Sequence, residues 1–234
     1  DNNASVSGTT IISNHADAEG GGIRTGYGGV IRNCIIYYNK AGEHDNYCLP
    51  AGSIAYSCLR PLANGTGNIS TPPALAGFRN WRLVPGSPCI DAGSFEFAAG
   101  DYDLDGDPRI WGGGVDMGCD EFYPPDLGGP LTVIVEADTD RAVTGSPVSF
   151  QCDVDGMPES YVWTFTDGFS VSNTPFVERA FNVPGLHTAM VTATNADGAA
   201  SNSVTVEIFP GYTNYVSLAG GHVFPYTNRP EAAT

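Results

Sequence analysis

The sequence has few positive charges and hardly any stretch of good helix formers. Its 234 residues include 10 Lys and Arg against 26 Asp and Glu, and Lys40 is the only lysine. A net charge of −16 repels phosphate backbones and anionic lipid, which argues against nucleic acid and membrane surfaces as partners. Cations and neutral glycans remain open as partners. The same charge also fits a protein that needs it only for solubility outside the cell.

Long apolar runs and the common catalytic signatures are absent as well. No apolar stretch approaches the length of a membrane span, and no signal peptide is visible. There is no GxSxG elbow, no phosphate-binding loop and no dinucleotide fingerprint. No CxxC pair or clustered Cys/His spacing suggests zinc. We therefore expect no membrane span, no cofactor-binding residues and no catalytic residues in this chain.

The six cysteines do not define a disulfide map. Their even number is typical of a disulfide framework, and an oxidising compartment is consistent with it. Cys152 falls in a different segment from the other five, so pairing within segments leaves at least one thiol free.

What the sequence does contain is turn residues and short apolar runs. Thirty glycines and seventeen prolines, with 41% hydrophobic residues, predict short strands joined by many turns around real cores. The chain is therefore predicted to be all-β.

A repeat runs through the first half. The segment TIISNHA, from Thr10, echoes CIIYYNKA, from Cys34, and a third apolar stretch ends at Cys58, so the three residues are evenly spaced. Such a period predicts stacked circuits of short strands, with Thr10, Cys34 and Cys58 in register on neighbouring circuits. Cys34 and Cys58 would then lie within disulfide reach or form a buried ladder of free thiols. The expected interior is Ile11, Ile12, Ile35, Ile36 and Ile54, and the expected corners are Gly20, Gly21, Gly22, Gly28 and Gly29.

Residues 1–123 resemble the C-terminal end of bacterial right-handed parallel β-helix surface proteins of the choice-of-anchor type. The motifs that carry the resemblance are NCIIYYN, WRLVPGSPCIDAG from Trp81, and DLDGDPRIWGGGVDMGCDEF from Asp103. The resemblance implies that the last motif seals the end of the helix. It assigns that role to Pro108, Arg109, Gly113, Asp116 and Gly118.

The aspartates before this seal raise the question of a metal. Asp101, Asp103, Asp105 and Gly106 match the start of a helical calcium loop, but position 12 is Gly112, so an EF-hand is excluded. A looser calcium site stays open, because ten acids against one base in residues 91–126 repel one another unless a cation screens them. In the alternative, aspartates cap turns, Arg109 pairs with a buried acid such as Asp116, and Trp111 covers the end. The candidate calcium ligands are Asp101, Asp103, Asp105 and Asp107.

A second module follows a proline-rich linker at residues 124–130. Beyond it, strands of alternating polarity, regularly separated by turn residues, predict an Ig-like β-sandwich at residues 131–209. The run YVWTFTDG, from Tyr161, and RAFNVPGLHTAMVTATN, from Arg179, resemble the polycystic kidney disease (PKD) domain. That resemblance implies core positions for Trp163 and Phe165 and turns at Asp167, Gly168 and Gly185. Thr164, Thr166, Arg179 and Phe181 depart from the family pattern.

The last segment, 210–234, resembles the start of a second, truncated β-helix. The whole therefore predicts a non-catalytic structural and adhesive piece of a large modular bacterial protein, extracellular or on the cell surface. Polysaccharide or other surface proteins are the expected partners.

The alternative is a piece of a β-helix polysaccharide lyase or glycoside hydrolase whose catalytic turns lie upstream. Such lyases use a basic residue beside calcium, and such hydrolases use paired acids. The charged residues of the first half show neither arrangement and are typical of solvated corners. They are His15, Asp17, Glu19, Arg24, Lys40, Glu43, His44 and Asp45.

Overall fold

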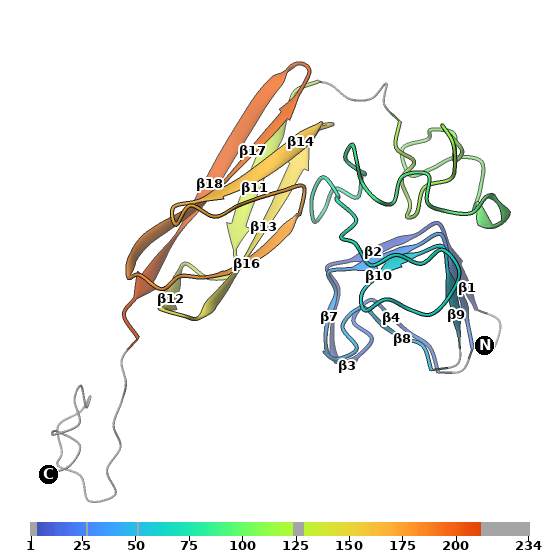
Figure 1. Cartoon of the computed structure of the whole chain (residues 1–234), viewed down its shortest axis with the longest axis horizontal. Helices are drawn as coiled ribbons and strands as arrows, with labels where there is room; N and C mark the ends of the chain where they lie inside the picture. The colour runs from blue at the N-terminus through green and yellow to red at the C-terminus, as the bar shows by residue number, and fades with distance from the viewer. Residues whose placement is uncertain (1–3, 27, 51, 124–128, 212–234) are drawn as a thin grey trace, which may run out of the picture.

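The computed structural model describes residues 4–26, 28–50, 52–123 and 129–211, and it contains two all-β units side by side (Figure 1). The only helical element in the described residues is a 3-10 turn, Phe95–Phe97. None of the described helices is long or apolar enough to cross a membrane. The predicted all-β class is confirmed. The predicted β-helix start at 210–234 lies almost wholly outside the described residues, as does most of the linker at 124–130.

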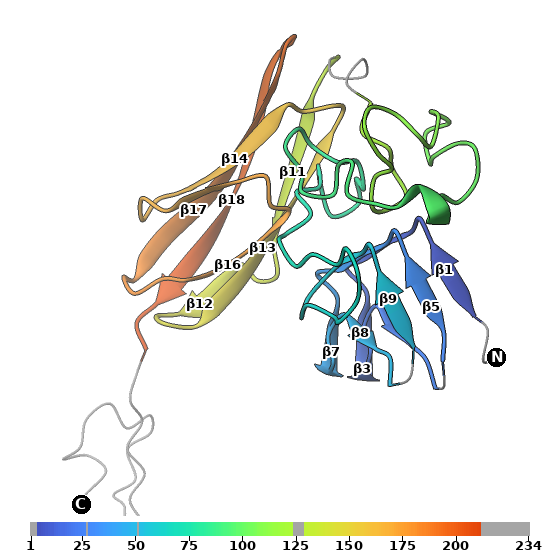
Figure 2. The ribbon, with the colours of Figure 1, turned by 45° about the vertical axis from the view of Figure 1, so that its right-hand side comes forward.

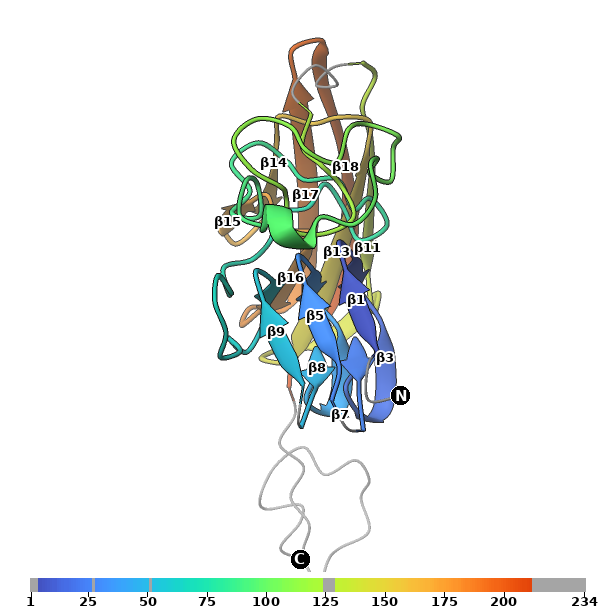
Figure 3. The same ribbon diagram turned by 90° about the vertical axis from the view of Figure 1, so that its right-hand side faces the viewer.

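The first unit begins as a coil, residues 4–59, in which each strand pairs in parallel with strands of the next circuit. Figure 3 shows β1, β5 and β9 side by side, and the same stacking joins β2 to β6 and β10. Two-stranded sheets form the other sides, from β3 with β7 and from β4 with β8. The strands are β1 (Ser5–Ser7), β2 (Thr10–Ile12), β3 (His15–Glu19), β4 (Ile23–Arg24), β5 (Val30–Arg32), β6 (Ile35–Tyr37), β7 (Lys40–Glu43), β8 (Tyr47–Cys48), β9 (Ser53–Ala55) and β10 (Cys58–Leu59).

The predicted register of the coil is wrong by a single position. Thr10 pairs with Ile35, and Ile35 pairs with Cys58, so Cys34 does not stand between the other two. The physical reason is that the two circuits differ in length, since the one from Thr10 to Ile35 is longer than the one from Ile35 to Cys58. Side chains alternate between the faces of a strand, so this shift sends Cys34 and Cys58 to opposite faces.

The sheet of β2, β6 and β10 is buried on both faces. Its inner face packs inside the coil, where Ile36 and Leu59 join Cys34. Its outer face lies under residues 70–122, which we name the cover, and there Ile35 packs with Leu83 and Met117. Burial on both faces explains why the run CIIYY is apolar throughout instead of alternating. Of the isoleucines expected inside the coil, Ile12 and Ile35 belong instead to the contact with the cover.

The second unit is a sandwich of two sheets. One sheet has the order β11-β13-β16 and the other β12-β18-β17-β14-β15. Their inner faces enclose Trp163, Phe150 and Tyr161, each no more than 1% exposed. The strands are β11 (Thr132–Ala137), β12 (Arg141–Val143), β13 (Pro147–Asp155), β14 (Ser160–Phe165), β15 (Ser170–Ser172), β16 (Phe176–Ala180), β17 (Gly185–Asn195) and β18 (Gly198–Phe209).

A short piece of the cover completes one sheet of the sandwich. Strand β16 pairs with β13 only as far as Gln151, and beyond it residues 76–78 lie along β13. Phe78 N–H donates to the Cys152 carbonyl at 3.2 Å, and Val154 N–H donates to the Ala76 carbonyl at 3.1 Å. Figure 2 shows the cover along one edge of the coil, with its first, teal part beside the sandwich. We name the pairing of residues 76–78 with β13 the joint.

Side chains reinforce the joint. The buried carboxylate of Asp153 accepts the Arg79 N–H at 2.7 Å, and Asn80 donates its side-chain amide to the Val154 carbonyl at 2.6 Å. The Tyr161 hydroxyl donates to the Leu75 carbonyl. Ala76 and Val84 of the cover also belong to the sandwich core. The two units therefore share both backbone hydrogen bonds and apolar packing.

Replacing Gly77 by alanine should open the joint. A Cβ at Gly77 would stand 2.8 Å from the Asp153 Cα, whereas a Cβ at Gly26 would meet nothing within 4 Å. We expect Gly77→Ala to speed amide exchange at Phe78 and Val154 roughly tenfold or more, or ~1.4 kcal/mol. Hydrogen exchange with mass spectrometry measures this, with Gly26→Ala as the matched control. Equal exchange in the two variants would contradict the tight joint.

Candidate functional site

A groove of about 790 Å³ lies between the coil and the sandwich. On the coil side it is lined by residues 13–15 and 37–40, together with Asp45, Asn46, Arg60 and Pro61. Residues 149–151 of β13 and 176–178 of β16 line the opposite wall. Because the joint fixes the sandwich beside the coil, both walls of the groove are held in place.

Aromatic rings form part of the groove. Tyr38 packs against Tyr37 at 4.7 Å between ring centroids and against Phe176 of the sandwich at 4.8 Å. The Tyr38 hydroxyl lies 3.5 Å from the Thr174 hydroxyl. Burial raises the pKa of Tyr38 to about 12. The groove therefore offers apolar ring surface that crosses from one unit to the other.

Three asparagines in the coil wall are committed to the fold. Asn39 accepts the Asn14 N–H at 2.9 Å, and Asn46 accepts the Asn39 N–H at 3.0 Å. Asn46 also donates to the Arg60 carbonyl at 2.7 Å. This ladder satisfies backbone groups between circuits, and its two buried members, Asn39 and Asn46, are hydrogen-bonded as buried polar side chains must be. The asparagines shape the wall, and the exposed side chains on it are the ones that could bind a ligand.

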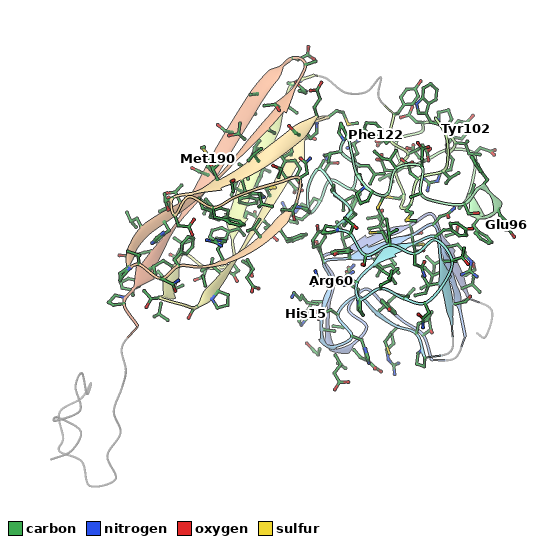
Figure 4. All side chains as sticks on the ribbon, viewed as in Figure 1. His15, Arg60, Glu96, Tyr102, Phe122 and Met190 are labelled. Atoms are coloured by element: carbon green, nitrogen blue, oxygen red, sulfur yellow. The ribbon has the colours of Figure 1, made fainter. Side chains whose placement is uncertain are left out.

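The exposed groups on the coil wall are mostly basic. Lys40 and Arg60 line the groove together with His15, and Figure 4 shows His15 and Arg60 on the side of the coil that faces the sandwich. The acidic groups of the groove are Asp45, which accepts the Ala41 N–H at 2.8 Å, and Glu178. In a chain with 26 acids and 10 bases, the groove has two bases, Lys40 and Arg60, for its two acids.

This groove was not predicted from the sequence. It forms between two units, and Tyr38 and Phe176 are distant in the chain, on opposite sides of the linker. The one available signal was the asparagine common to the two repeats, TIISNHA and CIIYYNKA, which are Asn14 and Asn39.

The structure places the four candidate calcium ligands in one turn of the cover, where the carboxylates of Asp103 and Asp105 bind other groups of the chain. Oδ1 of Asp103 accepts the N–H groups of three residues, at positions 105, 106 and 107, each at 2.9 Å. Its Oδ2 accepts the Glu121 N–H at 2.9 Å. The Asp105 carboxylate accepts hydrogen bonds from Nε and Nη2 of Arg82, each at 2.7 Å. The carbonyl of Asp101 accepts the Arg109 N–H, and that of Asp107 accepts the Asp103 N–H. Calcium binding therefore stays a prediction, and the ion would compete with these donors.

The buried base of the cover pairs with a different acid from the one named in the sequence analysis. Arg109 lies 3.9 Å from Glu121, and donates to the backbone carbonyls of Asp116 and Gly118. The Asp116 carboxylate instead accepts the N–H groups of Asp91 and Phe122, at 2.7 and 2.6 Å. Arg109 and Asp116 thus hold the cover together mainly through backbone groups. Trp111 is 42% exposed and packs edge-on against Tyr123.

The residues expected in the sandwich core and turns have the following places. Trp163 is fully buried, stacks on Phe165 at 5.8 Å and donates its indole N–H to the Thr174 carbonyl. Asp167 pairs with Arg179, and Gly168, at φ +86°, donates to the Phe165 carbonyl across the turn. Gly185 begins β17 with φ +129°.

All six cysteines lie in the described residues, and none forms a disulfide. Five are buried and Cys119 is half-buried. Cys34 packs inside the coil, whereas Cys58 packs with Cys89 under the cover. Burial raises the pKa of Cys34 to about 11, so this thiol is unreactive at neutral pH.

The comparisons with known proteins identify the second unit. The family model of the PKD domain matches residues 132–208, which confirms the predicted PKD domain in that part of the chain. No curated protein matches the chain.

Three solved structures show partial similarity. One, titled as the structural basis for the promiscuous specificity of carbohydrate-binding modules from the β-sandwich superfamily, is 21% identical, with 38% of each chain covered and a TM-score of 0.33. The PKD domain of the human VPS10 domain-containing receptor SorCS2 is 20% identical, with 46% of this chain and 98% of that chain covered and a TM-score of 0.29. An engineered protein is 15% identical, with 39% and 22% covered and a TM-score of 0.28. This chain thus spans 38% of the first of these proteins and 22% of the engineered one.

Neutralising Asp120 should remove part of the pH dependence of stability. Burial raises the pKa of Asp120 from 3.8 to about 7, while its Oδ2 accepts the Leu83 N–H at 2.8 Å. A raised carboxyl pKa contributes stability that is complete below about pH 4 and is lost as the pH rises through about 7. We expect the melting temperature of Asp120→Asn to rise relative to wild type between these pH values, because asparagine still accepts the N–H but carries no charge.

The matched control is Asp17→Asn, because Asp17 is fully exposed. The rise for Asp120→Asn with pH should exceed any change in this control. A difference from wild type that does not vary with pH for Asp120→Asn would contradict the assignment.

Calcium binding at the cover has its own test. If the ion binds, chelation with EGTA should lower the melting temperature of the full chain, and Asp105→Asn should weaken calcium binding because it removes one carboxylate ligand. Differential scanning calorimetry measures the shift, with Asp138→Asn in the sandwich as the control. A melting temperature that does not respond to calcium removes the site.

Proposed function

We propose that this chain is a non-catalytic structural and adhesive segment of a large modular bacterial protein, extracellular or on the cell surface, and that its groove contacts polysaccharide. The PKD match at residues 132–208 and the presence of two different β units in one chain support a modular protein. The observation that carries the proposal is the groove itself, which both units build and the joint holds open.

The first unit is, in this proposal, the end of a right-handed parallel β-helix. Three successive strands pair in parallel on two sides of the coil, which supports the assignment. The cover then serves as the seal, because it buries the outer face of one sheet and ends the run of circuits. An end sealed in this way leaves the sandwich, rather than another circuit, as the next module.

The joint makes the segment suitable as a spacer. Modules connected by a linker alone move relative to each other, whereas shared backbone hydrogen bonds and a shared apolar core resist such motion. The segment would therefore present its surfaces in one fixed orientation.

The chemistry of the groove suits a sugar chain. Tyr38 and Phe176 supply ring surface, and Lys40 and Arg60 supply hydrogen-bond donors around it. Binding sites for small molecules and sugars commonly combine apolar lining with a few placed polar groups. A groove open at the surface accommodates a chain passing through it, as polysaccharide binding requires.

Removing Arg60 should weaken glycan binding. We expect the wild-type chain to bind a subset of neutral or acidic glycans on an array. Arg60→Ala should bind the same glycans roughly tenfold more weakly, because a charged donor is lost. The matched control is Arg141→Ala, at an exposed arginine on β12 of the sandwich. Equal binding by both variants, or no binding by wild type, would contradict a role for the groove.

The chain should not cleave the glycans that it binds. We expect no release of unsaturated or reducing ends when the bound polysaccharide is incubated with the chain. Release of either product would overturn the non-catalytic assignment in favour of a lyase or hydrolase.

A further inference from the structure

A separate cluster of side chains that could bind a metal ion lies at one corner of the coil. Glu19, His44 and Cys48 each place one ligand atom within 4.8 Å of the others. Glu19 ends β3, His44 follows β7, and Cys48 ends β8, so the cluster spans two stacked circuits. None of the three belongs to the groove, the cover or the sandwich.

Parallel pairing brings these residues together across the corner. Glu19 lies opposite Glu43 in the pair of β3 with β7, and Arg24 lies opposite Cys48 in the pair of β4 with β8. The Gly20 N–H donates to the carbonyls of Glu43 and His44 at 3.2 and 3.1 Å. The two circuits are therefore stacked closely where the three side chains meet.

The two carboxylate oxygens of Glu19 have separate partners. Arg24 Nε donates to Oε1 at 2.6 Å, and the Cys48 thiol donates to Oε2 at 3.2 Å. The carboxylate, the thiol sulfur and the imidazole thus lie within 4.8 Å of one another, while Arg24 binds Oε1 of the carboxylate. Residues that hydrogen-bond to a metal ligand and so fix its orientation are common in metal sites.

We propose that Glu19, His44 and Cys48 form a zinc site that links two successive circuits of the coil. A thiolate, an imidazole and a carboxylate are all ligands that Zn²⁺ accepts, whereas calcium prefers oxygen ligands alone. Ligands at bond lengths of about 2.0 to 2.3 Å in a tetrahedron stand roughly 3.3 to 3.8 Å apart. The three ligand atoms therefore have to move closer to one another by about 1 Å or a little more when the metal binds. The exposed side chain of His44 can make this movement.

Zinc binding here would use the thiol in its deprotonated form. The Cys48 proton leaves to solvent when sulfur bonds to the metal, and Glu19 Oε2 exchanges its hydrogen bond from sulfur for a bond to the same ion. No electron is transferred. Three protein ligands leave the fourth position for water or a group from outside the chain.

The site is tested on the full chain under reducing conditions. We expect one equivalent of Zn²⁺ to bind in isothermal titration calorimetry and to raise the melting temperature, because zinc binds the folded coil. Co²⁺, which absorbs light when bound by a thiolate, should bind at the same stoichiometry with a sulfur-to-cobalt charge-transfer band. Calcium should displace neither ion.

Variants identify the ligands. Cys48→Ser should abolish the charge-transfer band, and His44→Asn should weaken zinc binding at least about tenfold. Asparagine tolerates the positive φ of His44, which is +56°, so this change removes the imidazole with little backbone strain. The matched controls are Cys119→Ser and His187→Ala, at a cysteine and a histidine outside the cluster.

Two results would overturn the proposal. One is the absence of zinc-dependent heat and of a cobalt band in the wild-type chain. The other is zinc binding that the Cys48 and His44 variants reduce no more than their controls do, which would place the ion elsewhere.

Discussion

The sheet of β2, β6 and β10 holds the whole arrangement together, because both of its faces are buried. Inside the coil its side chains pack with those of the other circuits, and outside they pack under the cover through Ile35, Leu83 and Met117. A single short sheet thus belongs to two apolar clusters, and its burial both stabilises the coil and positions the cover. Everything beyond the coil depends on that placement, since the cover supplies residues 76–78 to the sandwich.

From the cover onward, the chain uses backbone pairing where an ordinary modular protein uses a linker. The edge of β13 past Gln151 accepts residues 76–78, and Tyr161 and Asp153 fasten the same segment from the sandwich side. Two different β units are therefore joined by backbone pairing, and the groove with Tyr38 and Phe176 lies between them. The corner with Glu19, His44 and Cys48 has a different origin, because it depends on the stacking of circuits within the coil alone.

Much of the fold could be predicted from sequence because its signals are local. Alternation and turn residues predicted the sandwich, and the motifs around Trp163 identified a PKD domain that the family model confirms at 132–208. The register of the coil could not be predicted, because the echo between TIISNHA and CIIYYNKA conceals circuits of unequal length. The partner of Arg109 was equally inaccessible, since Asp116 and Glu121 are both near it in sequence and only folding selects Glu121. The groove and the corner cluster were missed because each joins residues from separate circuits or units.

The completion of β13 by residues 76–78 means that the family boundary and the folding unit do not coincide. A piece cut at residues 131–209 would keep every strand of its two sheets, yet part of one border would offer unpaired N–H and C=O groups to any passing chain. It would also lose Ala76 and Val84 from its interior. Such an excised module should tend to associate with itself. Its low solubility would result from the loss of residues 76–78 and not from the module's own sequence.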